Sequence, residues 1–173
     1  VVNCIGHTDT YSKDREPHWN VNYRFVHQLS TICNLKGKKL VHIGTDQIYA
    51  GNTIHEPTEE DVPVHAENWY AYTKLLGDGI VQLNMTNYLL CRGTHKSRKF
   101  EWDTAFVDKV GNFDYVDVIA PQIIKLIEGD KCGIYNVGTE LKTSAELIRR
   151  EFPNIEGSLT PSYIPKKTTM SVK

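Results

Sequence analysis

Apolar and polar residues alternate along the first half of the chain in blocks that distinguish strands from helices. Short apolar runs predict buried strands, whereas apolar residues recurring every three or four positions predict helices with one face on a core. Val21, Phe25, Leu29 and Ile32 form a stripe of the second kind. The expected elements are strand 1–5, helix 19–35, strand 39–43, helix 69–84 and strand 88–91. This alternation is typical of a parallel sheet, with right-handed crossovers that place helices on its faces.

Beyond Arg92 the regular pattern stops, and it returns only in the last third of the chain. Thr143 is followed three residues later by Glu146, which is the spacing of a capping box at the start of a helix. No period is visible over 154–173, where Ser, Thr, Pro and Lys are frequent. The elements expected in this part are helix 118–128, strand 133–137 and helix 143–152.

The composition is that of an ordinary globular domain, and it argues against several function classes. None of the 173 residues lies in an apolar run near the roughly 18 residues that a membrane span needs. The formal net charge of -1 and one short basic stretch, 95–99, argue against a nucleic-acid partner. The spacing of Cys4, Cys33, Cys91 and Cys132 fits neither a disulfide framework nor a zinc site. We therefore expect free thiols, a cytoplasmic protein and no metal.

Tyr70 and Lys74 stand four residues apart on a predicted helix and so share one face. A phenol has an ordinary pKa of about 10, and a nearby ammonium would lower that pKa by favouring phenolate. Many such pairs arise by chance on solvated helix faces. Thr45 favours a catalytic role for the pair over a chance occurrence, because it ends the preceding strand, where open α/β sheets bind ligands. Its hydroxyl could hydrogen-bond the oxygen that Tyr70 protonates, although alone it would be read as a turn-capping residue.

Three motifs then follow one another in order. They are the strand end 41–51 (VHIGTDQIYAG), the acidic loop with Glu56-Pro57 and Glu60-Asp61-Val62-Pro63, and the helix 70–77 (YAYTKLLG). Their order, spacing and composition resemble the extended short-chain dehydrogenase/reductases, and within them the dTDP-4-dehydrorhamnose reductase branch. The resemblance extends from residue 1 to about residue 150, through the segments 1–6, 21–22, 115–117 and 133–138.

The resemblance implies a Rossmann-like parallel sheet with helices on both faces, and NAD(P)H-dependent reduction of a 4-keto nucleotide-sugar. Thr45 would orient the keto group, Tyr70 would give the proton, and Lys74 would lower the Tyr70 pKa and bind the nicotinamide ribose. NADPH or NADH is the implied cofactor and a nucleotide-sugar the implied partner, with a homodimer left open. The implied contacts are Cys4, Ile5, Gly6, Tyr70, Lys74 and Arg92 for the cofactor, and Thr45, Asp46, Gln47 and Thr94 for the substrate.

The same resemblance predicts how the chain is divided. Residues 1–92 would be the carboxyl-terminal part of the cofactor-binding domain, with the catalytic residues, and 93–173 a small mixed substrate-binding portion. The sequence holds no Gly-x-x-Gly-x-x-Gly loop and opens inside a strand. We therefore expect a fragment of a longer enzyme that lacks the first strands and binds a dinucleotide weakly or not at all.

Two further departures keep alternatives open. Gly44 stands where the family usually has Ser, and the substrate-binding stretch 92–111 is short, with Phe100, Trp102 and Phe106 crowded into it. A non-catalytic regulatory or binding subunit is favoured by the missing loop and the short stretch. A nucleotide-sugar epimerase would use the same Tyr and Lys. A dehydratase is disfavoured, because Gln47 follows Asp46 where an acidic pair is usual.

Overall fold

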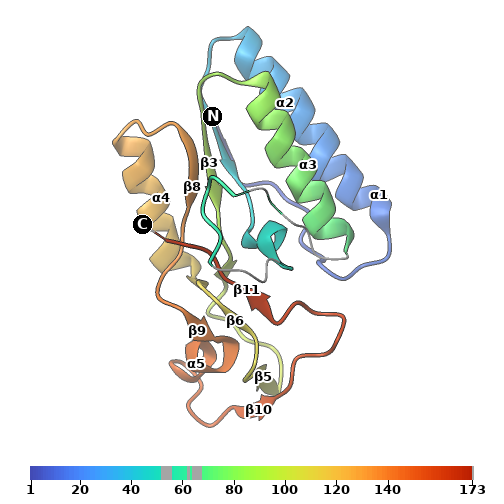
Figure 1. Cartoon of the computed structure of the whole chain (residues 1–173), viewed down its shortest axis with the longest axis vertical. Helices are drawn as coiled ribbons and strands as arrows, with labels where there is room; N and C mark the ends of the chain where they lie inside the picture. Colours follow the sequence, from blue (N-terminus) through green and yellow to red (C-terminus); the bar gives the residue numbers. More distant parts are fainter. Residues whose placement is uncertain (52–55, 62, 64–67, 173) are drawn as a thin grey trace.

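A four-stranded parallel sheet organises the computed structural model, which describes residues 1–51, 56–61, 63 and 68–172. The strands lie in the order β1-β2-β3-β8, and every neighbouring pair is parallel. Figure 1 shows the sheet in the upper part of the molecule, between the helices. The prediction that the first three apolar runs form adjacent parallel strands is confirmed. Their bounds are β1 (Val2–Asn3), β2 (Leu40–Ile43), β3 (Tyr88–Arg92) and β8 (Gly133–Asn136).

Helices cover both faces of this sheet, as the resemblance implied. Successive strand residues point to opposite faces, so neighbours on β2 enter different cores. Leu40 packs with Val26 and Val81, which come from α2 and α3. Val41 packs with Ile119 of α4 on the other face. The helices are α2 (Phe25–Leu35), α3 (Trp69–Asn84) and α4 (Val116–Glu128), and Figure 1 shows α2 and α3 on one side of the strands and α4 on the other.

The first helical segment is longer than predicted, because it begins at Arg15 and includes a π-helical stretch. The side chain of Asp14 accepts a hydrogen bond from the Glu16 N–H and caps this start. The wider π turn carries Asn22, whose Oδ1 accepts the His7 N–H at 2.8 Å. Period counting cannot detect such a turn, which interrupts the 3.6-residue repeat. The segment consists of α1 (Arg15–His18), η1 (Trp19–Arg24) and α2.

The second helix, α3, has the predicted bounds. Asn68 caps it, since its Oδ1 accepts the Ala71 N–H at 2.7 Å. Between β2 and this helix lies a short 3-10 helix, η2 (Asp46–Tyr49), that sequence reasoning treated as loop. Val62 of the acidic loop motif lies outside the described residues.

A smaller lobe of short strands lies beyond the carboxyl ends of the sheet (Figure 1). The tail after residue 153, for which no period was visible, contributes two of these strands. Two- or three-residue strands are too short to show an alternating pattern. The pairs are β4–β7, β5–β10 and β11–β6–β9. The bounds are β4 (His95–Lys96), β5 (Thr104–Phe106), β6 (Val110–Gly111), β7 (Asp114–Tyr115), β9 (Lys142–Thr143), α5 (Ser144–Arg149), β10 (Glu156–Ser158) and β11 (Lys167–Thr168).

The predicted division at residue 92 stays a prediction, and the topology bears on it. The chain leaves the main sheet after β3 and returns to it through α4 and β8, which pairs with β3 from Leu89 to Arg92. The lobe is therefore built from two stretches, one on each side of this return.

The capping box at the start of α5 is present: the Thr143 side chain accepts the Glu146 N–H, and Glu146 accepts the Thr143 N–H.

Two glycines of α3 provide a matched test of how closely this helix packs on η1. A Cβ at Gly77 would collide with the backbone oxygen of Asn22, whereas a Cβ at Gly79 would meet nothing within 4 Å. We expect Gly77→Ala to lower the free energy of unfolding by about 1–3 kcal/mol through overpacking. Gly79→Ala should raise it by about 0.5–1 kcal/mol, because alanine favours helix. Urea unfolding of both variants checks this, and equal effects would contradict the close approach.

Candidate active site

The site forms where β2 ends, next to the first turn of α3. Thr45 follows β2, is 1% exposed, and caps η2 by accepting the Gln47 N–H at 3.3 Å. Tyr70 stands in the first turn of α3, and a side-chain hydrogen bond joins it to Thr45. The structure therefore brings together the two hydroxyls that were expected to share one substrate oxygen.

Lys74 lies one helical turn after Tyr70 and is buried, with 4% of its surface exposed. Its Nζ donates a hydrogen bond to the backbone oxygen of Ile43 at 2.6 Å, which ties α3 to the end of β2. Burial lowers the Lys74 pKa, and the charge of Asp78, a further turn along the helix, opposes this. Tyr70, Lys74 and Asp78 thus form a column on one face of α3.

The expected lowering of the Tyr70 pKa by Lys74 is not what this structure shows. Burial raises the pKa of Tyr70 to about 12, the Thr45 hydrogen bond lowers it, and the charges of Asp46 and Asp78 raise it. Lys74 points toward Ile43, so its ammonium does not act on the phenol. Tyr70 is therefore held as a neutral phenol at physiological pH, which is the form that can donate a proton.

Arg92 was expected to contact the cofactor, but its side chain lies in the interior and is 2% exposed. Its Nε donates to Asp78 at 3.1 Å, and its Nη1 donates to the Tyr49 hydroxyl at 2.7 Å. Both ends of the guanidinium are thus engaged by the fold, and the expectation for this side chain is corrected. The same pair fills the space over Gly44, where a Cβ would come within 3.3 Å of Arg92 and 3.2 Å of Asp78.

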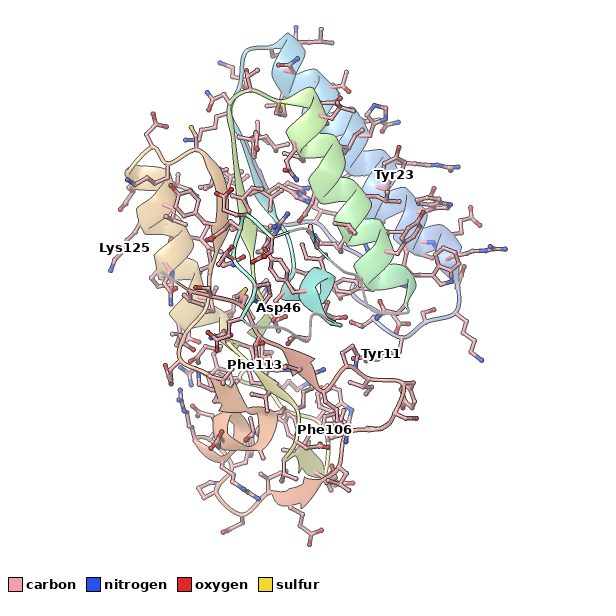
Figure 2. All side chains as sticks on the ribbon, in the orientation of Figure 1. Tyr11, Tyr23, Asp46, Phe106, Phe113 and Lys125 are labelled. Atoms are coloured by element: carbon pink, nitrogen blue, oxygen red, sulfur yellow. The ribbon has the colours of Figure 1, made fainter. Side chains whose placement is uncertain are left out.

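Asp46 is fully buried beside the candidate catalytic residues, and Figure 2 shows it where the sheet meets the smaller lobe. Its Oδ1 accepts a hydrogen bond from the Thr94 hydroxyl. Burial raises the Asp46 pKa; the Thr94 hydrogen bond and the charges of Lys109 and Lys96 lower it.

A cavity of about 710 Å³ opens between the sheet and the lobe. Among the predicted site residues of this region, Tyr70, Gln47 and Thr94 line it, whereas Thr45, Asp46 and Lys74 do not. Cys4, Ile5 and Gly6 lie exposed beyond the end of β1 and do not line this cavity. Sequence reasoning missed five other lining residues with evident binding chemistry, although the basic stretch and the crowded aromatics had signalled them: Lys96, Phe100, Trp102, Phe106 and Lys109.

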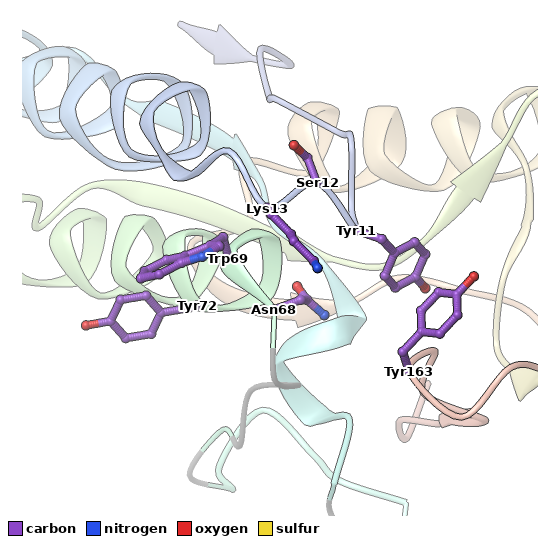
Figure 3. A pocket seen from close by; sticks show the side chains of 7 residues that line it. All are labelled: Tyr11, Ser12, Lys13, Asn68, Trp69, Tyr72 and Tyr163. Carbon is purple, nitrogen blue, oxygen red and sulfur yellow. The ribbon is translucent and has the colours of Figure 1, made fainter.

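A second hollow of about 950 Å³ adjoins the first. Figure 3 shows Tyr11 and Tyr163 facing one another at one end, and Trp69 and Tyr72 at the other, with Lys13 between them. The rings of Tyr11 and Tyr163 meet edge to face at 5.8 Å. Both tyrosines also line the first cavity, so they form the wall that the two spaces share.

The sequence pattern of one known family, described as the RmlD substrate binding domain, matches residues 1–125. The chain belongs to this family. Among curated proteins, none matches the sequence closely enough to be counted a relative. The comparison with solved structures concerns the fold alone, because the identities there are low.

Several dTDP-4-dehydrorhamnose reductases share the fold of this RmlD-family chain. The Bacillus anthracis enzyme, solved in complex with NADP, has a TM-score of 0.85 and 21% identity over 99% of this chain and 71% of its own. A hypothetical reductase from Sulfolobus tokodaii has a TM-score of 0.80 and 23% identity over 98% and 69%. The UDP-glucuronic acid 4-epimerase of Bacillus cereus, solved with NAD, has a TM-score of 0.72 and 18% identity over 90% and 60%. The expected α/β Rossmann-like class and family resemblance are confirmed.

Within the described ranges, no helix is both long and apolar enough to cross a membrane. No group of three or more His, Cys, Asp or Glu side chains among the described residues is arranged to hold a metal ion.

Proposed function

We propose that this protein reduces the 4-keto group of a nucleotide-sugar with NADPH or NADH. The observation that carries the proposal is the hydrogen-bonded pair of Thr45 and Tyr70 at the end of β2, with Tyr70 facing the 710 Å³ cavity. Membership of the RmlD family and the fold shared with the reductases support it.

In this proposal the carbonyl oxygen of the sugar lies between the two hydroxyls. Thr45 donates a hydrogen bond that orients the oxygen, and Tyr70 gives its proton to that oxygen as negative charge develops there. Lys74 holds α3 against the end of β2 through Ile43, which fixes Tyr70 relative to Thr45. The raised Tyr70 pKa keeps the proton on the phenol until negative charge develops on the carbonyl oxygen.

The residues beyond β1 fit a dinucleotide. Cys4, Ile5 and Gly6 are exposed at the carboxyl end of the sheet, where open α/β folds bind such ligands. Ile5 is 58% exposed and offers an apolar surface, and two of the three donors of Lys74 remain beyond its bond to Ile43. These residues, with Tyr70, would hold the cofactor, which when bound supplies the hydride.

The test is reduction of a 4-keto-6-deoxy nucleotide-sugar by the purified protein, with NADPH or NADH at millimolar concentration, because the sequence holds no glycine loop and we expect weak cofactor binding. We expect oxidation of NADPH or NADH that depends on the sugar and yields the 4-hydroxy product, followed by nicotinamide absorbance and by mass spectrometry. Binding of both ligands without product would contradict the proposal and favour a non-catalytic subunit.

An epimerase is the second candidate, because the fold is also that of the UDP-glucuronic acid 4-epimerase. Such a reaction starts by removing a proton from an alcohol, so it needs Tyr70 as phenolate. A Tyr70 pKa raised to about 12 disfavours that form and therefore favours reduction. Interconversion of two 4-hydroxy epimers without net cofactor oxidation would reverse this choice.

A further inference from the structure

Two lysines line the cavity that Tyr70 faces, and neither makes an ion pair or a side-chain hydrogen bond with the residues that the structure describes. Lys96 comes from β4 and Lys109 from the turn before β6, and both are half-buried. The Nζ of Lys96 lies 5.3 Å from the centre of the Phe113 ring, which is a cation–π contact. Lys39 and Lys166, by contrast, each contact an aspartate at 2.7 Å.

The two ammonium groups are close enough to repel one another. The pKa of Lys109 is lowered to about 8, mainly by burial and also by the charge of Lys96, while the charge of Asp46 opposes the shift. Burial also lowers the pKa of Lys96, again opposed by Asp46. Asp46 is the one acid that acts on both lysines, and it is engaged by Thr94. Two cations facing one buried acid leave a site of net positive charge, which favours binding of an anion.

Aromatic side chains lie beside these lysines. Phe100 and Trp102 meet edge to face at 5.2 Å, and both line the cavity with Phe106. Trp102 is 68% exposed, so most of its ring is free to contact a ligand. A cationic pair next to exposed rings is the chemistry that recognises a phosphorylated aromatic group, with the rings available for stacking.

We propose that Lys96 and Lys109 bind the diphosphate of the nucleotide-sugar, with Trp102 contacting its base, so that the sugar extends toward Tyr70. This assignment rests on the proposed function and adds the residues that anchor the substrate. It also explains how a short segment between β3 and β6 can recognise a nucleotide: a few strongly interacting side chains replace a longer binding loop.

The test measures binding of dTDP, UDP, ADP-ribose and inorganic pyrophosphate by calorimetry and by Trp fluorescence. We expect dTDP or UDP to bind, and Lys96→Gln and Lys109→Gln each to weaken that binding about 10- to 100-fold, the effect of losing one charge-assisted hydrogen bond. Lys125→Gln is the matched control, because Lys125 is exposed on α4 and points away from the cavity (Figure 2). Circular dichroism establishes that each variant is folded, and pyrophosphate should compete with dTDP on the wild-type protein.

The pH dependence provides a second readout that needs no variant. An anion favours protonated Lys109, so affinity for dTDP should be greatest below the free pKa of about 8 and fall up to tenfold per pH unit above it. Lys109→Gln should flatten this profile. Lys96 and Asp46 are the charged groups that face Lys109; burial lowers the pKa of Lys96 and raises that of Asp46.

The outcomes separate this proposal from the proposed function. Lysine-dependent dTDP binding without reduction would leave the anchor standing and remove the reductase. Reduction with an unchanged KM in both lysine variants would do the opposite. No binding of dTDP or UDP by the wild-type protein, or a loss confined to ADP-ribose, would overturn the assignment to the substrate diphosphate.

Discussion

Tyr70→Phe is expected to lower kcat for reduction of a 4-keto nucleotide-sugar by about 10²- to 10⁴-fold, because it removes the proton donor and keeps the ring. KM should change much less, since the lost bond matters most as charge develops on the carbonyl oxygen. Steady-state kinetics with saturating reduced cofactor measure both constants.

Tyr88→Phe is the matched control for this experiment. Tyr88 begins β3 at the opposite end of the sheet and packs against the core between α2 and α3. Its variant should keep normal kcat while losing one hydroxyl of the same chemistry. A Tyr70→Phe protein with wild-type kcat would show that the proton comes from elsewhere, and the reductase mechanism given above would then be wrong.

Asp78→Asn is expected to lower the free energy of unfolding by about 3–5 kcal/mol, because it leaves Arg92 buried without a countercharge. Asp78 is fully buried, accepts from Arg92 Nε at 3.1 Å, and lies 3.8 Å from His42 Nε2. Denaturant unfolding monitored by Trp fluorescence gives the free energy.

Asp117→Asn supplies the comparison for this prediction. Asp117 pairs with Arg98 at 2.7 Å, but both side chains are about half exposed, with 54% and 46% of their surface free. Solvent screens such a pair, so its loss should change stability far less. Equal losses from the two aspartate variants would show that the buried pair is not what anchors α3 to β3.

The main sheet and its helices follow from local patterns, and the smaller lobe does not. Apolar runs of four or five residues are long enough to identify β2 and β3, and the apolar stripe of α3 repeats over four turns. The strands β4 to β7 are two or three residues long. Of these, β5 pairs with β10, and β6 pairs with β9 and β11, all from far along the chain. Pairing over such separations depends on tertiary contacts that no single window contains.

Sequence patterns likewise predicted some features of the candidate site and not others. Motif spacing identified Thr45 and Tyr70, and the structure joins them by a hydrogen bond. The direction of the Tyr70 pKa and the burial of Arg92 depend instead on which groups the fold places nearby. Arg92 ends a strand in sequence, yet its guanidinium lies in the interior and donates hydrogen bonds to Asp78 and Tyr49. Position in a motif therefore predicts where a backbone lies better than where a long side chain points.

The wall shared by the two hollows is built from segments near both ends of the chain. Tyr11 comes from the loop after β1 and Tyr163 from the tail between β10 and β11, and their rings touch. Each ring bounds both spaces. A ligand bound in either hollow would therefore contact the same two rings, one from the loop and one from the tail.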